Sequence, residues 1–178
     1  KLMQQLTLMT PQNFDEAGIG RKQDFNQNDE VRTGEICWIN DETAAGKEWL
    51  AWTAELQVYL NRRLFLGLFS FESHFAHYSP GDFYKKHMDA FRGEANRVLT
   101  VVTYLNPEWQ SEEGGELVVY MDGKDRIGQK VMPNSGTLVV FLSEEFPHEV
   151  LPTSRDRYSI AGWYRVNTSS THRVDPPQ

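Results

Sequence analysis

The stretch FSFESHFAHY, residues 69–78, decides the fold class, because apolar side chains alternate with small or polar ones along much of its length. Such alternation is typical of a β-strand with one buried face. Similar short runs follow it, separated by turn-forming segments: RVLTVVTYL (97–105), GGELVVYM (114–121), GTLVVFLS (136–143), HEVL (148–151) and RYSIAGWYRV (157–166). Strands at this spacing predict an all-β sandwich or barrel.

One long helical pattern precedes these strands. In TAAGKEWLAWTAELQVYLNRRL, residues 43–64, the large apolar residues Trp49, Trp52, Leu56 and Tyr59 recur at helical spacing. A helix with one apolar face must bury it against another element. We therefore expect a mainly β protein whose sheets are buttressed by this helix.

The composition is that of one globular domain. The chain has 178 residues, 39% of them hydrophobic, and a net charge of −7. We expect one domain over residues 1–166 and a C-terminal tail over 167–178. The acidic balance argues against nucleic acid or an anionic membrane as the main partner. Because the single cysteine, Cys37, cannot form an internal disulfide, we expect a cytoplasmic protein.

A candidate metal site begins in YKKHMDAF, residues 84–91, where His87 and Asp89 are separated by one residue. On a strand, side chains two positions apart leave the same face and can reach one ion, whereas on a helix they diverge. The pair is therefore a ligand candidate only if this stretch is extended. By itself it is equally compatible with an ordinary histidine and aspartate on a solvated strand.

A second histidine from a distant strand would complete an iron-type site of two imidazoles and one carboxylate. His148, in FPHEVLP, is that candidate, and Arg157 follows it by nine residues at the start of the strand-like RYSIAGWYR. The remaining histidines fit better as ordinary side chains of a strand or the tail: His74, His77 and His172.

These residues carry a resemblance to a known family. The HxD…H…R pattern of His87, Asp89, His148 and Arg157 resembles the signature of iron(II)- and 2-oxoglutarate-dependent oxygenases. Longer segments are similar in order and spacing to prolyl hydroxylases of the EGL-nine, oxygen-sensing type and their bacterial relatives: VRTGEICWI, YSPGDFYKKHMDAF, RVLTVVTYLNPEW, GGELVVY and PHEV with RYSIAGWYR.

The resemblance implies a double-stranded β-helix, or jelly roll, with Fe(II) and 2-oxoglutarate as cofactors and L-ascorbate as an auxiliary reductant. It implies that His87, Asp89 and His148 bind the metal and that Arg157 pairs with the distal carboxylate of 2-oxoglutarate, a role that suits the planar, permanently charged guanidinium. By position, the remaining pocket residues would be Tyr78, Tyr104 and Trp163 for the cosubstrate, and Tyr84, Arg32 and Trp163 for the substrate.

The implied reaction is hydroxylation of a prolyl residue in a protein, with succinate and CO₂ as co-products. Among possible substrates, the bacterial relatives suggest translation elongation factor Tu. The polar segment 20–34 is expected to fold over a bound polypeptide. The alternative is an oxygenase of a free amino acid or another small molecule, since it would need the same iron and Arg157. Nucleic-acid demethylases fit less well, because Trp163 stands where they carry a second arginine.

Overall fold

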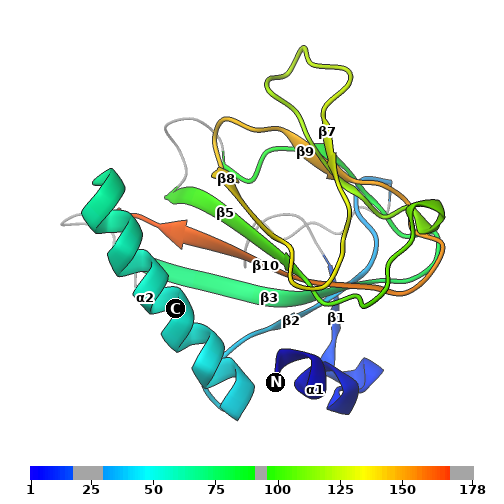
Figure 1. Ribbon diagram of the computed structural model, residues 1–178, viewed down its shortest axis with the longest axis horizontal. Helices are drawn as coiled ribbons and strands as arrows, with labels where there is room; N and C mark the ends of the chain where they lie inside the picture. The colour runs from blue at the N-terminus through cyan, green and yellow to red at the C-terminus, as the bar shows by residue number, and fades with distance from the viewer. Residues whose placement is uncertain (18–29, 91–95, 169–178) are drawn as a thin grey trace.

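The computed structural model describes residues 1–17, 30–90 and 96–168 (Figure 1). Most of the segment expected to cover the substrate, residues 20–29, lies outside these ranges, and so do residues 169–178 of the expected tail. None of the described helices is long and apolar enough to cross a membrane.

Two antiparallel sheets form the body of the chain. The major sheet contains, in spatial order, β1 (Asp15–Glu16), β2 (Glu35–Trp38), β3 (Ser70–Tyr78), β10 (Arg157–Arg165), β5 (Arg97–Tyr104) and β8 (Leu138–Leu142). The minor sheet contains β4 (Tyr84–His87), β9 (His148–Val150), β6 (Leu117–Val119) and β7 (Gln129–Val131). The crossing of strands between two facing sheets is the jelly-roll architecture, so the expected fold class is confirmed.

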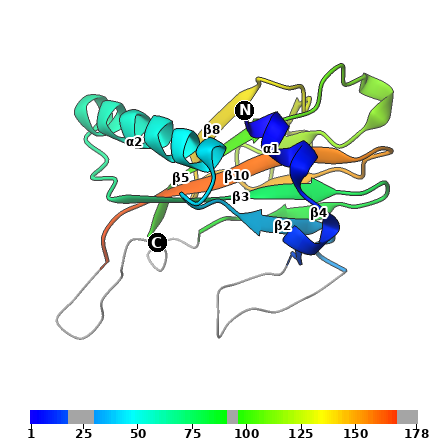
Figure 2. The same ribbon diagram turned by 90° about the horizontal axis from the view of Figure 1, so that it is seen from below.

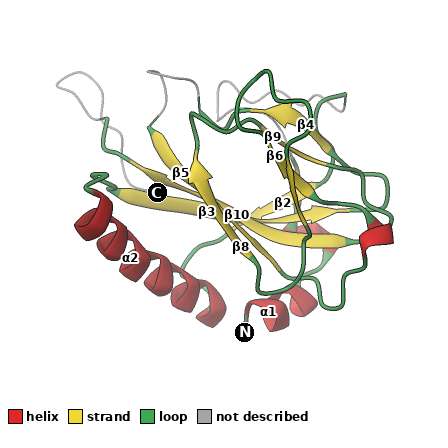
Figure 3. Cartoon of the chain, turned by 45° about the horizontal axis from the view of Figure 1, so that its top comes forward, coloured by secondary structure: helices red, strands yellow, loops and turns green. Residues whose placement is uncertain are grey.

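The described α-helices cover one side of the major sheet, and the minor sheet lies on the other (Figures 2 and 3). α2 (Ala44–Leu64) matches the helix expected over 43–64, with Thr43 as N-cap accepting the Gly46 N–H at 3.0 Å. Its Trp49 indole donates to Ser73 Oγ at 3.0 Å, which fastens the helix to β3. The short helices are α1 (Leu2–Leu8), η1 (Pro11–Asn13) and η3 (Ser111–Glu113).

The space between the two sheets holds the core nearest the candidate site. Its buried residues come from both sheets: Ala76, Tyr78, Val102, Tyr104, Leu117, Phe141 and Val150. Strand register places Arg157 opposite Tyr78 on β3, and Ser159 opposite Tyr104 on β5. Since alternate residues of β10 face this space, the side chain of Arg157 lies inside the barrel rather than on its surface.

One local expectation was wrong. The pair His87 and Asp89 was a ligand candidate on the condition that the stretch YKKHMDAF is extended, but β4 ends at His87 and Asp89 lies in the bend that follows. The partner strand explains this, because β9 begins at His148, which pairs with His87, and offers no residue to pair with the chain beyond it. Asp89 therefore reaches the site from a loop.

Candidate active site

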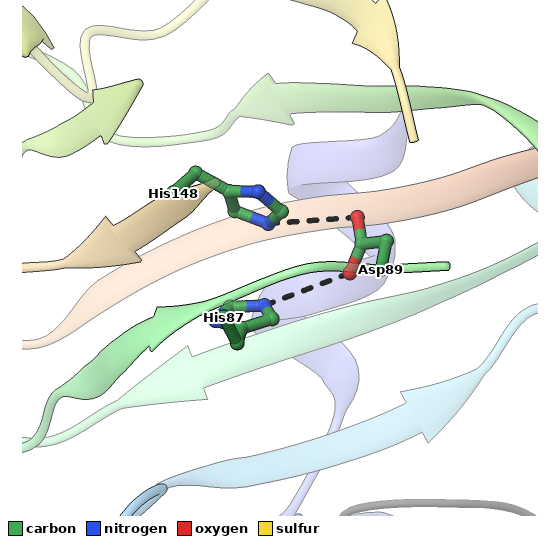
Figure 4. A group of neighbouring side chains, drawn as sticks. All are labelled: His87, Asp89 and His148. Carbon is green, nitrogen blue, oxygen red and sulfur yellow. Dashed lines mark ion pairs between the residues drawn. The ribbon is translucent and has the colours of Figure 1, made fainter. Parts of the chain in front are cut away.

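Three side chains converge between the sheets, and their ligand atoms all lie within 4.8 Å of one another: His87, Asp89 and His148 (Figure 4). The two histidines are cross-strand partners at the end of β4 and the start of β9. Asp89 faces both rings, with Oδ1 3.6 Å from His87 Nε2 and Oδ2 3.5 Å from His148 Nε2. The structure thus brings together the three residues that the sequence singled out as metal ligands.

Backbone carbonyls orient both imidazoles. Nδ1 of His87 lies 2.8 Å from the Lys85 carbonyl, and Nδ1 of His148 lies 3.1 Å from the Phe146 carbonyl. A neutral ring that donates its Nδ1 proton keeps the Nε2 lone pair for a metal. Both Nε2 atoms face Asp89, so the ring orientation suits a shared ion.

The charges of the cluster also suit a cation. Burial acts to raise the pKa of Asp89, but His148 and His87 outweigh it and hold that pKa well below its usual range. Burial lowers the pKa of His148, and the neighbouring Asp89 only partly opposes this. At neutral pH the cluster therefore presents a carboxylate together with a neutral His148 imidazole. Two imidazoles and one carboxylate form the facial set of non-haem iron(II) sites, which leaves three positions open.

A buried cation lies deeper in the same barrel. Arg157 is 1% exposed, and it donates from Nε to the Gly115 carbonyl at 2.7 Å and from Nη1 to Ser159 Oγ at 3.3 Å. Its guanidinium carbon lies 5.2 Å from the Tyr78 ring centre and 5.1 Å from that of Tyr104. Within the described ranges, no carboxylate lies within 4.0 Å of this guanidinium. A buried charge without a counter-ion is costly, which indicates a site for an anion.

The Tyr104 hydroxyl adds a second group suited to that anion. It is buried and has no hydrogen-bond partner among the described residues. Burial raises the pKa of Tyr104 to about 12, although Arg157 acts in the opposite direction. The phenol therefore keeps its proton and can donate it beside Arg157. A carboxylate would satisfy both groups at once.

The expected substrate residues lie on the His87 side of the site. The Tyr84 ring stacks on His87 with centres 3.5 Å apart, and the Arg32 guanidinium carbon lies 4.7 Å from the Tyr84 ring centre. Arg32 and Tyr84 also form an isolated β-bridge. The cation, the phenol ring and the imidazole therefore form one continuous stack that leads to the metal ligands.

Trp163 lies against the same cluster from β10. The guanidinium carbon of Arg97 is 3.7 Å from its ring centre, and Arg97 is paired with Glu72 at 2.9 Å. The Trp163 indole N–H makes no hydrogen bond of normal length with a described residue, but it lies close enough to Asp89 to help lower the pKa of that carboxyl. The arginine and glutamate at this wall were not among the expected site residues.

Two further hydroxyls escaped the sequence reasoning, namely Thr100 and Ser143, which form a hydrogen-bonded chain to Asp89. The sequence contains a signal for Thr100. Thr100 shares the inward face of its strand with Val102 and Tyr104, and it is the polar aliphatic side chain on that otherwise apolar or aromatic face. His74, by contrast, is buried between Trp38 and Trp163 and stays outside the ligand cluster.

Comparison with known proteins agrees with this geometry. Residues 73–165 match the family model described as the 2OG-Fe(II) oxygenase superfamily. The chain belongs to this superfamily. The family's name gives iron(II) and 2-oxoglutarate as its cofactors. The ligand cluster fits the metal, and the buried Arg157, which has no carboxylate partner among the described residues, fits the cosubstrate.

Individual relatives refine this placement. A prolyl-4-hydroxylase from Pseudomonas putida is 38% identical, with a TM-score of 0.80 over 93% of this chain and 84% of that one. A Trichoplax adhaerens prolyl hydroxylase, solved with a hypoxia-inducible factor peptide, is 28% identical, with a TM-score of 0.79 over 92% of this chain and 76% of that one. Human Egl nine homolog 1 is 35% identical over 86 residues, which is 47% of this chain but 20% of that protein. The resemblance to EGL-nine-type prolyl hydroxylases is thereby confirmed.

Proposed function

We propose that this chain hydroxylates a prolyl residue of a protein in a reaction that depends on Fe(II), 2-oxoglutarate and O₂. The observation that carries the proposal is the position of Arg157, a guanidinium 1% exposed and without a carboxylate partner among the described residues. It lies in the same barrel as the ligand cluster. A small dianion could use both features, because one of its ends would bind the metal while the carboxylate at its other end would pair with Arg157.

Different residues of the barrel would bind the metal and the cosubstrate. His87, Asp89 and His148 would hold the iron. Arg157 and the Tyr104 hydroxyl would bind the distal carboxylate of 2-oxoglutarate, with the Tyr78 ring also close to the guanidinium. When bound, iron and 2-oxoglutarate supply the oxidation, in which 2-oxoglutarate is converted to succinate and CO₂ and one oxygen atom enters a substrate C–H bond. The apolar walls of the core would help to keep water out of this space during the reaction.

Relatives described as prolyl hydroxylases, one of them solved with a peptide, support a protein substrate over a free amino acid. The chain covers most of the Pseudomonas and Trichoplax prolyl hydroxylases, and the second of these was solved with a peptide. Arg32, Tyr84 and Trp163 are the residues we assign to the substrate side, where the stack from Arg32 to His87 would guide an incoming chain to the metal. Translation elongation factor Tu is the first protein to test.

The test is mass spectrometry of elongation factor Tu, and then of a whole lysate, after incubation with the chain, Fe(II), 2-oxoglutarate and ascorbate. We expect a peptide one oxygen heavier at proline, dependent on 2-oxoglutarate and absent with the His148→Ala variant. A lysate in which no prolyl residue gains oxygen, together with turnover of free proline or another small molecule, would favour the small-molecule alternative.

A further inference from the structure

Asp89 differs from the two histidines in how it is held. His87 and His148 are fixed by strand pairing, whereas Asp89 lies in a bend after β4 ends. Its carboxylate nevertheless lies where both imidazoles can share an ion with it. Something other than the minor sheet must therefore set its position.

The major sheet supplies that contact. Thr100 of β5 donates its hydroxyl to Asp89 Oδ2 at 2.7 Å, a length typical of a strong bond to a carboxylate. Thr100 is 1% exposed and is held in the ladder of β5, opposite Phe141 of β8. The bond therefore reaches across the barrel from a rigid strand to a ligand on a loop.

Ser143 extends the contact into a chain with a definite direction. Its Oγ lies 2.9 Å from Thr100 Oγ1, and its backbone N–H donates to the Val98 carbonyl at 3.0 Å, which fixes the serine beside β5. An ionised carboxylate can only accept hydrogen bonds, so the single hydroxyl proton of Thr100 must be donated to Asp89. The bond between the two hydroxyls is then donated by Ser143. Both hydroxyls are fully buried, so water does not compete for them.

The hydrogen bonds from Ser143 through Thr100 make the two carboxylate oxygens of Asp89 different from each other. Oδ2 accepts the Thr100 hydroxyl and lies 3.5 Å from His148 Nε2, while Oδ1 lies 3.6 Å from His87 Nε2. An oxygen that accepts a short hydrogen bond has fewer lone-pair sites for a metal, and its orientation fixes the other oxygen. A facial site must keep three positions open, two for a chelating keto acid and one for O₂, and a carboxylate bound through both oxygens would occupy one of them.

We propose that Thr100, supported by Ser143, is a positioning residue that fixes the orientation of the Asp89 carboxylate, so that Asp89 binds the metal through one oxygen alone. The proposal rests on the metal site of the proposed function, but it concerns how that site is built. Ligand-orienting partners of this kind typically contribute about 10- to 100-fold in metal affinity.

The test uses metal binding without 2-oxoglutarate or a prolyl substrate. Co(II) affinity and the Co(II) visible spectrum are measured for the parent chain and for Thr100→Val, which replaces the hydroxyl with a methyl group of similar size. We expect Thr100→Val to weaken Co(II) binding by about 10-fold or more, with an altered spectrum, and Thr100→Ser to restore both. Ser143→Ala should give a smaller loss in the same direction.

Thr103→Val is the matched control, because Thr103 is on the same strand but donates to the Thr137 carbonyl at 3.0 Å. It should bind Co(II) as the parent does. If the parent binds Co(II) and Thr100→Val matches Thr103→Val in affinity and spectrum, the positioning role is overturned while the proposed function stands. Should Thr100→Val fail to fold, Ser143→Ala decides, and an unchanged affinity in that variant overturns the proposal. If His148→Ala binds Co(II) as tightly as the parent, the metal site itself is wrong.

Discussion

Ser159 connects Arg157 with Tyr104. Ser159 is the register partner of Tyr104 on the neighbouring strand, and its hydroxyl accepts from Arg157 Nη1 at 3.3 Å. The guanidinium carbon then lies 5.1 Å from the Tyr104 ring centre, beside a phenol whose hydroxyl has no partner among the described residues. A buried cation and a buried neutral donor therefore share one space, in which no carboxylate of a described residue lies within 4.0 Å of the cation.

Removing the cation should weaken 2-oxoglutarate binding. We expect Arg157→Ala to raise the dissociation constant by roughly 30-fold or more, because truncating one member of a buried charge pair costs about 2 to 5 kcal/mol. Arg157→Lys should recover only part of this, since an ammonium cannot reproduce the planar fork. Calorimetry with a redox-inert metal in place of iron measures the effect, and an unchanged affinity in Arg157→Ala would remove this residue from the cosubstrate site.

Removing the Tyr104 hydroxyl should have opposite effects on stability and on binding. Without ligand the buried hydroxyl has no described partner, so Tyr104→Phe should raise the free energy of unfolding by about 1 kcal/mol. The same variant should bind 2-oxoglutarate about 10-fold more weakly, because a hydrogen bond to a charged group is lost. Urea unfolding and calorimetry measure the two quantities.

Tyr164→Phe is the control for that experiment. Its hydroxyl donates to the Thr53 carbonyl at 2.7 Å and fastens β10 to α2, away from the site. This variant should lose stability and keep its affinity for 2-oxoglutarate. A Tyr104→Phe chain that behaves like Tyr164→Phe would show that the Tyr104 hydroxyl does not serve the cosubstrate.

The sequence predicted those features that local periodicity and motif spacing encode. The helix over 43–64 and the strands around Arg157 follow from patterns within a single segment. The bend at Asp89 does not, because it depends on where the distant strand β9 begins. The hydrogen bonds from Ser143 to Thr100 and from Thr100 to Asp89 do not follow from local patterns either, since they are set by the pairing of β5 with β8 and by the loop after β4 that carries Asp89. Contacts between elements remote in sequence carry no local signal.

Loss of a histidine ligand should abolish metal binding and turnover together. In His148→Ala the Nε2 that faces Asp89 is removed while the strand pairing of β9 is retained. We expect the iron content after reconstitution to fall to background and hydroxylation to be lost. His77→Ala is the control, because His77 pairs with Asp156 at 2.8 Å outside the ligand cluster. Normal iron content in His148→Ala would contradict the ligand assignment.

The Arg32 stack should affect the protein substrate selectively. Arg32→Ala removes the cation over Tyr84 and loosens the ring that lies against His87. We expect the KM for a prolyl polypeptide to rise about fivefold, equivalent to about 1 kcal/mol. Turnover of 2-oxoglutarate without that substrate should be unchanged. Arg63→Ala removes a similar cation over Tyr59 on α2 and should leave both activities intact, so an equal effect of the two variants would argue against a substrate role for Arg32.

Acid should destabilise the chain partly through His74. Burial, with Arg32 and Arg97 nearby, lowers the pKa of His74 to about 3 from its usual 6.5. Below pH 6.5 the unfolded chain takes up a proton at this position and the folded chain does not, so acidification favours unfolding. The contribution of His74 to the free energy of unfolding is therefore fully present above pH 6.5 and is lost as the pH falls toward 3. Between pH 8 and pH 5 the loss is about 2 kcal/mol.

His74→Phe tests this, because phenylalanine keeps an aromatic ring between Trp38 and Trp163 but cannot titrate. The free energy of unfolding is measured with urea at pH 8 and pH 5 on metal-free protein, so that metal release does not contribute. The variant loses the His74 bond to the Phe75 carbonyl at both pH values, which shifts its stability by a constant amount. All the other titratable groups are common to both chains, so their contribution cancels in the comparison. We therefore expect the parent to lose about 2 kcal/mol more than His74→Phe on going from pH 8 to pH 5, and equal losses would show that His74 is protonated in the folded chain.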